Sequence, residues 1–152
     1  MSRIPRHQEH LKTGFTAEAV SAARCRAFAT RAERDGLPNL ARRWLRLAAV
    51  KDALAIDLLE AAGQVRGTNA DLGTAISEER YENDILYPKI IREVDEEVAN
   101  DFLKVVAAQK EHLRQLEEMR DLLNASQGDV ALPEEVDKGT AAPAATSPAT
   151  GR

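Results

Sequence analysis

The stretch LARRWLRLAAVKDAL, which runs from Leu40 to Leu54, aligns without a gap on VANDFLKVVAAQKEH, which runs from Val98 to His112. Apolar residues recur at helical spacing in both stretches, so each predicts an amphipathic helix with one buried face. The alignment matches residues of similar size, in the pairs Ala41 with Ala99, Trp44 with Phe102, Leu45 with Leu103 and Ala49 with Ala107. A helix that recurs in both halves of a chain predicts two related helical hairpins, packed as a pseudo-symmetric four-helix bundle.

The composition favours the same all-α fold class. With 152 residues the chain is long enough for one domain with a sizeable core, and a second domain is not expected. Hydrophobic residues make up 43% of the chain and aromatic residues only 4%. This balance suits helices built on alanine and leucine better than an all-β domain.

Charge and cysteine content limit the classes of function. The net charge is −4 and basic residues alternate with acidic ones, so a nucleic-acid partner is not expected. No apolar run has the length of a signal peptide or approaches the roughly 20 residues that span a bilayer, which predicts a cytoplasmic protein with no membrane partner. The single cysteine, Cys25, excludes an internal disulfide and any C-x-x-C metal site. A metal would therefore need carboxylates and histidine.

Glycine and proline mark the ends of the first two helices. The first predicted helix runs from about Phe15 to Arg34, and Gly36 can end it. Pro38 can open the second helix, which we expect to end near Ala62. These two helices form the first predicted hairpin.

The third predicted helix covers about residues 72–95. Asn69 or Asp71 in the preceding loop is the expected N-cap. Pro88 lies inside the apolar pattern of this helix, so we expect a kink near Tyr87 with helix on both sides.

The fourth predicted helix covers about residues 96–125. We therefore expect a polar N-terminal arm over residues 1–14 and the bundle over residues 15–126. Residues 127–152 are rich in alanine, proline and threonine, and such a segment cannot bury enough apolar area to offset its ordering entropy. A disordered tail is predicted there.

Polar residues lie on the predicted inner faces. Gln109 and His112 are three apart on the fourth helix, on the face of its large apolar residues, so we expect them to point at the core. Glu79 and Glu82 have the same spacing on the third helix, and Glu18 lies on the apolar face of the first. The pattern resembles a bundle-core metal site built from glutamate and histidine, which suits iron or manganese.

Two motifs carry a family resemblance: AEAVSAARCRAFATRAERDG at residues 17–36 and AISEERYENDILYP at residues 75–88. Over roughly residues 15–119 the chain resembles the ferritin-like domain of the rubrerythrin family. The matching positions are Glu18, Arg24, Phe28, Ala29, Glu79, Glu82, Tyr87 and Pro88. The resemblance implies a ferritin-like bundle, usually in a homodimer, with a non-haem di-iron centre that reduces peroxide. In the family the electrons usually come through a rubredoxin module, for which this sequence lacks the C-x-x-C pairs.

The resemblance also implies a ligand set. Glu18 matches the lone ligand of the first helix, Glu79 and Glu82 match the pair of the third, and His112 matches the histidine of the fourth. The glutamate that precedes this histidine in the family is Gln109 here.

The second helix departs further from the family. Its Glu-x-x-His pair is replaced by Lys51 and Leu54. Lys51 and Gln109 thus fall where the two metal-bridging carboxylates stand, and Lys51 adds a fixed positive charge at the position of a cation. We expect this lysine to stand in for the metal.

Two hypotheses follow from these residues. The first is a non-catalytic helical dimer or partner-binding protein with a salt-bridged polar core. The second is a metal-binding oxidoreductase, peroxidase-like or iron-handling, with one ion of iron, manganese or zinc at a remodelled site. Its candidate ligands are Glu79, Glu82 and His112, with Glu18 and Gln109 as further donors.

A homodimer is expected under both hypotheses. The family resemblance implies one, and the predicted outer faces keep the apolar residues Ile56, Ile85 and Ile91. The substrate, the electron donor and any protein partner are not indicated by these residues.

Overall fold

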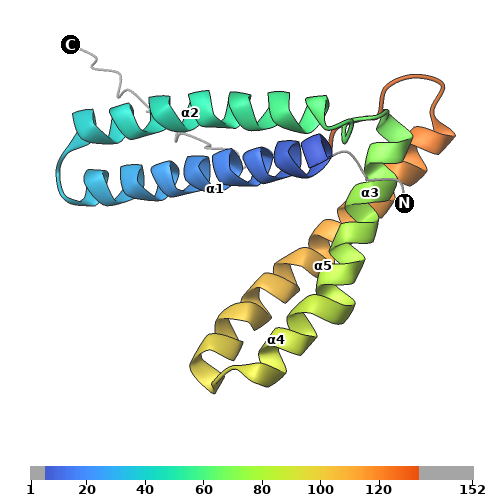
Figure 1. Cartoon of the computed structure of the whole chain (residues 1–152). Helices are drawn as coiled ribbons and strands as arrows, with labels where there is room; N and C mark the ends of the chain where they lie inside the picture. Colours follow the sequence, from blue (N-terminus) through green and yellow to red (C-terminus); the bar gives the residue numbers. More distant parts are fainter. Residues whose placement is uncertain (1–5, 134–152) are drawn as a thin grey trace, which may run out of the picture.

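The computed structural model describes residues 6–133, and this part of the chain is helical without strands. Its elements are α1 (Arg6–Arg34), α2 (Pro38–Ala61), α3 (Thr68–Tyr81), the π-helical turn η1 (Glu82–Leu86), α4 (Tyr87–Glu93) and α5 (Glu96–Ala125). Helices α1 and α2 form one hairpin, and the continuous segment α3–η1–α4 forms a second with α5 (Figure 1). The predicted all-α class and its construction from two helical hairpins are confirmed. None of the described helices combines the length and apolar character needed to cross a bilayer.

Small side chains form the contact between α1 and α2. The buried residues of these helices are Ala22, Cys25, Ala29, Ala32, Ala41, Ala48 and Ala55, at spacings of three, four and seven. Short side chains allow two helix axes to approach closely, because the distance between helices depends on the side chains at the contact. We call this line the alanine seam.

The turn between α1 and α2 requires glycine. Gly36 has φ +75°, in the left-handed region that glycine adopts without steric cost. The Leu37 N–H donates to the Ala32 carbonyl at 2.8 Å, which closes the last turn of α1. The predicted helix end at Gly36 and the predicted start of α2 at Pro38 are both confirmed.

Helix α1 begins at Arg6 rather than at Phe15, so part of the arm predicted for residues 1–14 is helical. The helix already contacts the C-terminal part of α2 at Gly14, where an added Cβ atom would lie 3.1 Å from the Leu58 side chain.

The start of α3 differs from the prediction. Its N-cap is Gly67, without a capping side chain, and neither Asn69 nor Asp71 occupies that position. Asp71 instead accepts a hydrogen bond from the Arg66 N–H at 3.0 Å, which ties the helix to its preceding loop. The carboxylate satisfies a loop donor, as an N-cap would satisfy a helix donor.

Pro88 is accommodated by a π-helical turn. Proline lacks the N–H that would bond to the carbonyl one turn earlier, and its ring crowds that carbonyl. The chain inserts η1 directly before α4, and the helix continues through Tyr87 as predicted. It ends at Glu93, and Asp95 caps α5 by accepting from the Val98 N–H at 3.0 Å.

The second hairpin is held by a half-buried line of residues on α5. These residues alternate between spacings of three and four: Ala99, Phe102, Val106, Gln109, Leu113 and Leu116. They lie opposite Leu72 and Ile76, the buried apolar residues of α3. At the turn of this hairpin, the rings of Tyr87 and Phe102 lie 5.7 Å apart.

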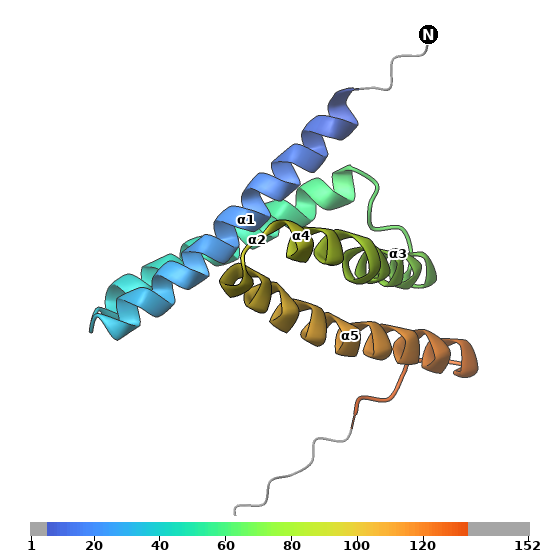
Figure 2. The same cartoon turned by 90° about the horizontal axis from the view of Figure 1, so that it is seen from below.

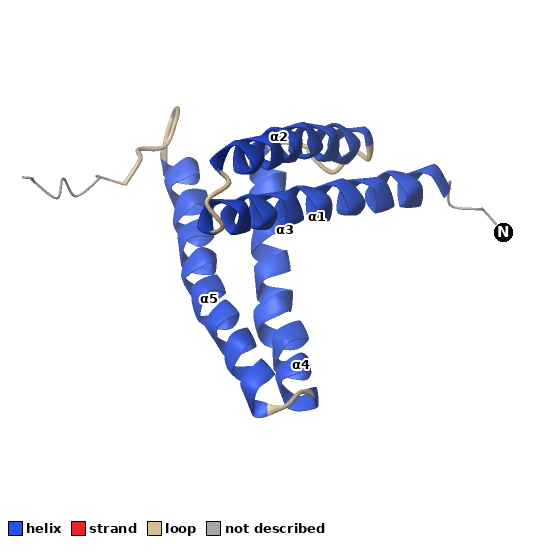
Figure 3. Ribbon diagram, turned by 90° about the vertical axis from the view of Figure 1, so that its left-hand side faces the viewer, coloured by secondary structure: helices blue, strands red, loops and turns tan. Residues whose placement is uncertain are grey.

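The two hairpins diverge from the loop around Gly63. No Cα atom of α1 or α2 lies within 8 Å of one in α3, η1, α4 or α5. Figure 2 and Figure 3 show this divergence from two further directions. The four helices expected in one bundle therefore lie as two separate halves, and none of the large side chains within residues 6–133 is fully buried. The tail predicted for residues 127–152 lies outside the described residues from residue 134 onward.

Replacing Ala41 by leucine is expected to destabilise the protein by roughly 1–3 kcal/mol, because the added methyl groups must enter the alanine seam. Ala41 is only 1% exposed. The same replacement at Ala53, an exposed residue of α2, is the matched control and should change stability by at most about 0.5 kcal/mol. Urea denaturation measures both. Equal effects at the two positions would show that the seam has room.

Candidate functional site

An ion pair links the two helices of the first hairpin. The Lys51 Nζ atom of α2 lies 3.1 Å from the Glu18 Oε2 atom of α1 and donates a hydrogen bond to it. The two side chains are 24% and 29% exposed, so the pair is partly shielded from solvent. It differs in this from the pair Lys104–Asp101 on α5, where both side chains are more than 70% exposed. The structure thus brings one predicted site residue, Glu18, into contact with Lys51.

A second polar pair links the helices of the other hairpin. The Gln109 Nε2 atom of α5 donates a hydrogen bond to the Glu82 Oε2 atom at the start of η1. The other amide atom, Gln109 Oε1, is buried and has no hydrogen-bond partner among the described residues. Here too, a nitrogen donor binds a carboxylate that was predicted as a site residue.

Further buried polar atoms beside this pair are unsatisfied. The Oε2 atom of Glu79 and both amide atoms of Asn83 have no partner within residues 6–133. A buried polar atom without a partner costs roughly 1–3 kcal/mol. In native proteins such atoms usually have a partner, which is protein, ordered water or an ion.

Asn83 was not among the predicted site residues. It lies one helical turn after Glu79 and two turns after Ile76, so the period of the helix places all three on one face. Only 8% of Asn83 is exposed. The same spacing argument that selected the two glutamates would have found it.

His112 does not point at a core in this structure. The sequence predicted a buried position beside Gln109, but His112 is exposed while Gln109 is half-buried. The reason is the divergence of the hairpins, which leaves this side of α5 uncovered. Val105 and Met119, seven residues before and after His112, are also exposed.

The predicted ligand set is divided between the hairpins. Glu18 lies on α1, while the other four residues lie on the second hairpin, at Glu79, Glu82, Gln109 and His112. Among the described residues, no group of three or more histidine, cysteine, aspartate and glutamate side chains lies close enough to hold a metal ion. The residues also do not fit a di-iron centre, because Lys51 and Gln109 supply no bridging carboxylate.

Glu111, the neighbour of His112, does not replace the missing carboxylate. Hydrogen bonds from Arg114 and then from Gln115 lower the pKa of Glu111 to about 2. Its carboxylate is therefore ionised at neutral pH and is already bound by the Arg114 guanidinium, at 2.7 Å and 3.0 Å.

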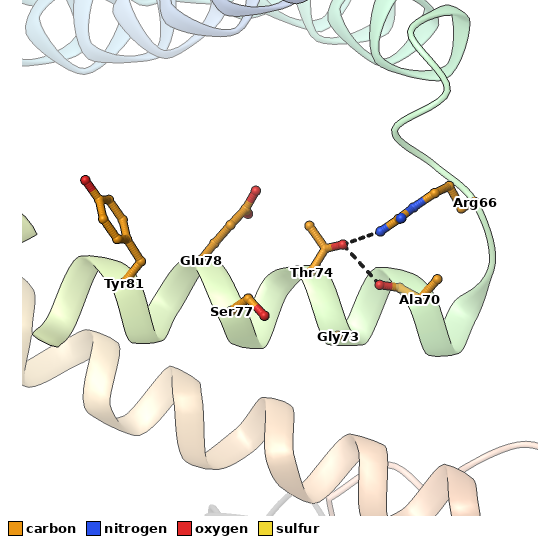
Figure 4. A pocket seen from close by; sticks show the side chains of 7 residues that line it. All are labelled: Arg66, Ala70, Gly73, Thr74, Ser77, Glu78 and Tyr81. Carbon is orange, nitrogen blue, oxygen red and sulfur yellow. Dashed lines mark hydrogen bonds between the residues drawn. The ribbon is translucent and has the colours of Figure 1, made fainter. Parts of the chain in front are cut away.

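An open pocket lies along another face of α3 (Figure 4). Arg66 donates a hydrogen bond to the Thr74 hydroxyl at 2.6 Å, and this hydroxyl donates to the Ala70 carbonyl at 3.1 Å. Glu78 and Tyr81 project from the same helix. None of the predicted site residues lines this pocket, and it does not adjoin either polar pair.

Replacing Gln109 by leucine is expected to destabilise the protein by roughly 1–3 kcal/mol, because the half-buried Glu82 loses the hydrogen bond that the Gln109 amide donates to it. The control is leucine at Gln115, which bonds Glu111 on the exposed side of α5 at 3.0 Å. That change should lie within about 0.5 kcal/mol of the parent. Chemical denaturation compares the two, and a neutral result at Gln109 would place its amide in solvent.

No protein-family model matches this chain, and no curated protein matches it. The similarity to rubrerythrins rests on the two sequence motifs and stays a prediction. What the described residues show is an all-helical protein of four helical segments, arranged as two hairpins, with the pair Lys51–Glu18 across the first and the pair Gln109–Glu82 across the second.

Proposed function

We propose that this chain is a non-catalytic helical protein in which lysine and glutamine take the place of metal in the polar centre, and that its role is self-association or partner binding. The observation that carries this proposal is the partly buried ion pair between Lys51 and Glu18. The ammonium lies on the carboxylate that the family motif assigns to a metal, and the bond neutralises that carboxylate without an ion.

Electrostatics supports this proposal. Two unit charges about 4 Å apart interact by roughly 4 kcal/mol at an effective dielectric constant of about 20, so a divalent cation beside Lys51 would be repelled by roughly 8 kcal/mol. A carboxylate at this position would have attracted the same ion. Replacing the carboxylate by an ammonium therefore works against a metal next to Glu18.

Exposed apolar residues support a binding role. Leu47 and Leu54 on α2 are 43% and 47% exposed, and Ile85 in η1 is 57% exposed. Of the residues that suggested a dimer in the sequence, Ile56 is also exposed and Ile91 is half-buried. Large apolar side chains gathered on uncovered helix faces mark surfaces for another protein, and a homodimer is the commonest assembly.

Changing Lys51 to methionine should destabilise the protein by roughly 1–3 kcal/mol, because Glu18 keeps its charge and loses its partner. The full penalty for a deeply buried pair is not expected, since both side chains retain some solvent contact. The matched control is Lys104→Met on the exposed surface of α5, which should be neutral. Urea denaturation gives both values. No change in stability for Lys51→Met would show that the ion pair does not stabilise the fold.

One observation favours the alternative, a metal-binding oxidoreductase with a mononuclear site. The Oε2 atom of Glu79, the Oε1 atom of Gln109 and the Oδ1 atom of Asn83 are buried oxygens without partners among the described residues, on the hairpin that also carries Glu82 and His112. Oxygen donors with an imidazole suit iron, manganese or zinc. The metal content of protein purified without added metal separates the two functions, because the proposal expects a substoichiometric value.

Restoring the full ligand set of the family is expected to create metal binding. The triple variant Lys51→Glu, Leu54→His and Gln109→Glu should take up two ferrous ions per chain and melt at a higher temperature when they are present, because binding to the folded state stabilises it. The parent should take up at most one. Anaerobic iron titration followed by thermal melting measures both proteins, and two irons in the parent would contradict the proposed function.

A further inference from the structure

The first hairpin has one open face with Lys51 at its centre. Leu47 and Leu54 recur at seven-residue spacing on the exposed side of α2, and Trp44 and Lys51 lie next to them at the same spacing. The ring centroids of Phe28 from α1 and of Trp44 lie 5.2 Å apart in an edge-on arrangement, and Phe28 extends this face. The face therefore carries Lys51 among exposed apolar side chains.

The second hairpin has a matching face. Val98, Val105, His112 and Met119 recur every seven residues on α5, and all four are exposed. Gln109 lies beside this stripe and bonds to Glu82 across the hairpin. A seven-residue repeat of exposed apolar residues is the pattern by which one helix packs against another.

The polar groups of the two faces complement each other. Lys51 has three N–H donors, and among the described residues it gives a hydrogen bond to Glu18 alone. The second hairpin offers buried acceptors for which residues 6–133 hold no donor, at Glu79 and Gln109, together with the charge of Glu82. Bringing the faces together would place a cation with free donors against carboxylates with free acceptors, which lowers the cost of burying both.

We propose that a second copy of this chain covers both faces reciprocally. The α1–α2 hairpin of one copy packs on the second hairpin of its partner, so Lys51 and Glu18 meet the partner's Glu79 and the partner's Glu82. Each polar core is then built from two chains and is incomplete in one. This inference rests on the self-association in the proposed function and gives it a geometry.

A reciprocal exchange fits the arrangement of the hairpins. They already diverge, joined by a loop in which Gly63 has φ +67°, so no contact within the chain has to break. Two copies related by a twofold axis cover all four open faces and leave none exposed. The chain also lacks a fully buried large side chain among residues 6–133, and such side chains would be supplied by the packing of the two hairpins.

Two charge-reversal variants test this geometry. The chain with Lys51→Glu should form poor homodimers because carboxylates face carboxylates, and the chain with Glu82→Lys should do so because ammonium faces ammonium. Each should melt several degrees below the parent. When the two are refolded together, every bundle regains opposite charges between the hairpins, so we expect a one-to-one heterodimer with twice the 16.7 kDa mass of one chain. It should melt above either variant alone but below the parent, because Glu18 no longer has Lys51 as its partner in one of the two chains.

The control is the double variant, which carries both changes in one chain. Its melting temperature should rise above those of the single variants whether the hairpins pair within one chain or between two chains. Recovery of the double variant without rescue on mixing would show that the hairpins close within one chain, and the proposal would fall. No recovery in either case would show that Lys51 and Glu82 do not meet, and this outcome would overturn the proposal as well. Matched surface changes, Lys110→Glu and Glu60→Lys, should melt like the parent alone and mixed.

Cross-linking of the unaltered chain gives a second test that does not depend on the folding of variants. Light and heavy isotope-labelled chains are unfolded, refolded together and treated with a zero-length carbodiimide reagent. Exchange predicts that Lys51 couples to Glu79 or Glu82 and that about half of these linked peptides join a light arm to a heavy arm, as random pairing gives. The proposal would be overturned if the two linked peptides always carried the same isotope label. It would also be overturned if Lys51 coupled to neither Glu79 nor Glu82.

These results are independent of the metal analysis. A chain that binds iron and still exchanges hairpins would contradict the proposed function and support this inference. A metal-free monomer would contradict the exchange of hairpins and would agree with a centre neutralised by lysine. A metal-free dimer without cross-links between light and heavy chains would do the same.

Discussion

The alanine seam between α1 and α2 is the constraint on which the rest of the structure depends. Alanine at the contact line lets the two helices approach closely, but it leaves the large apolar side chains no place in that contact. Leu47, Leu54 and Phe28 consequently lie to the side of the seam and remain uncovered. A hairpin built in this way is a half-core, because its most hydrophobic surface faces away from its own contact.

The polar residues follow the same division. Each hairpin bonds one of the predicted site carboxylates internally, Glu18 through Lys51 in the first and Glu82 through Gln109 in the second. A cation in one pair and an amide in the other leave the polar groups closer to a hydrogen-bonded network than to a metal cage. The buried atoms of Glu79 and Asn83 are the part of this network that residues 6–133 of one chain do not satisfy.

Local signals in the sequence predicted the helices well. Gly36 and Pro38 have specific backbone requirements, and α5 covers residues 96–125 as expected. The start of α1 was wrong because the helix continues beyond the apolar pattern to Arg6. The cap of α3 was wrong because Asp71 binds a loop N–H instead. The exposure of His112 could not be predicted, since periodicity identifies the face of a helix and says nothing about which chain covers that face.

The π-helical turn at η1 separates two registers within one helical segment. In a regular helix each residue advances the face by about 100°, so a single extra residue between Glu82 and Leu86 shifts everything after it relative to everything before. The polar face around Glu79 and the aromatic contact of Tyr87 with Phe102 are therefore not tied to one helical phase. In evolutionary terms, the residues before and after η1 are able to change their packing separately. Loss of one residue at η1 would restore a single helical register for the whole segment.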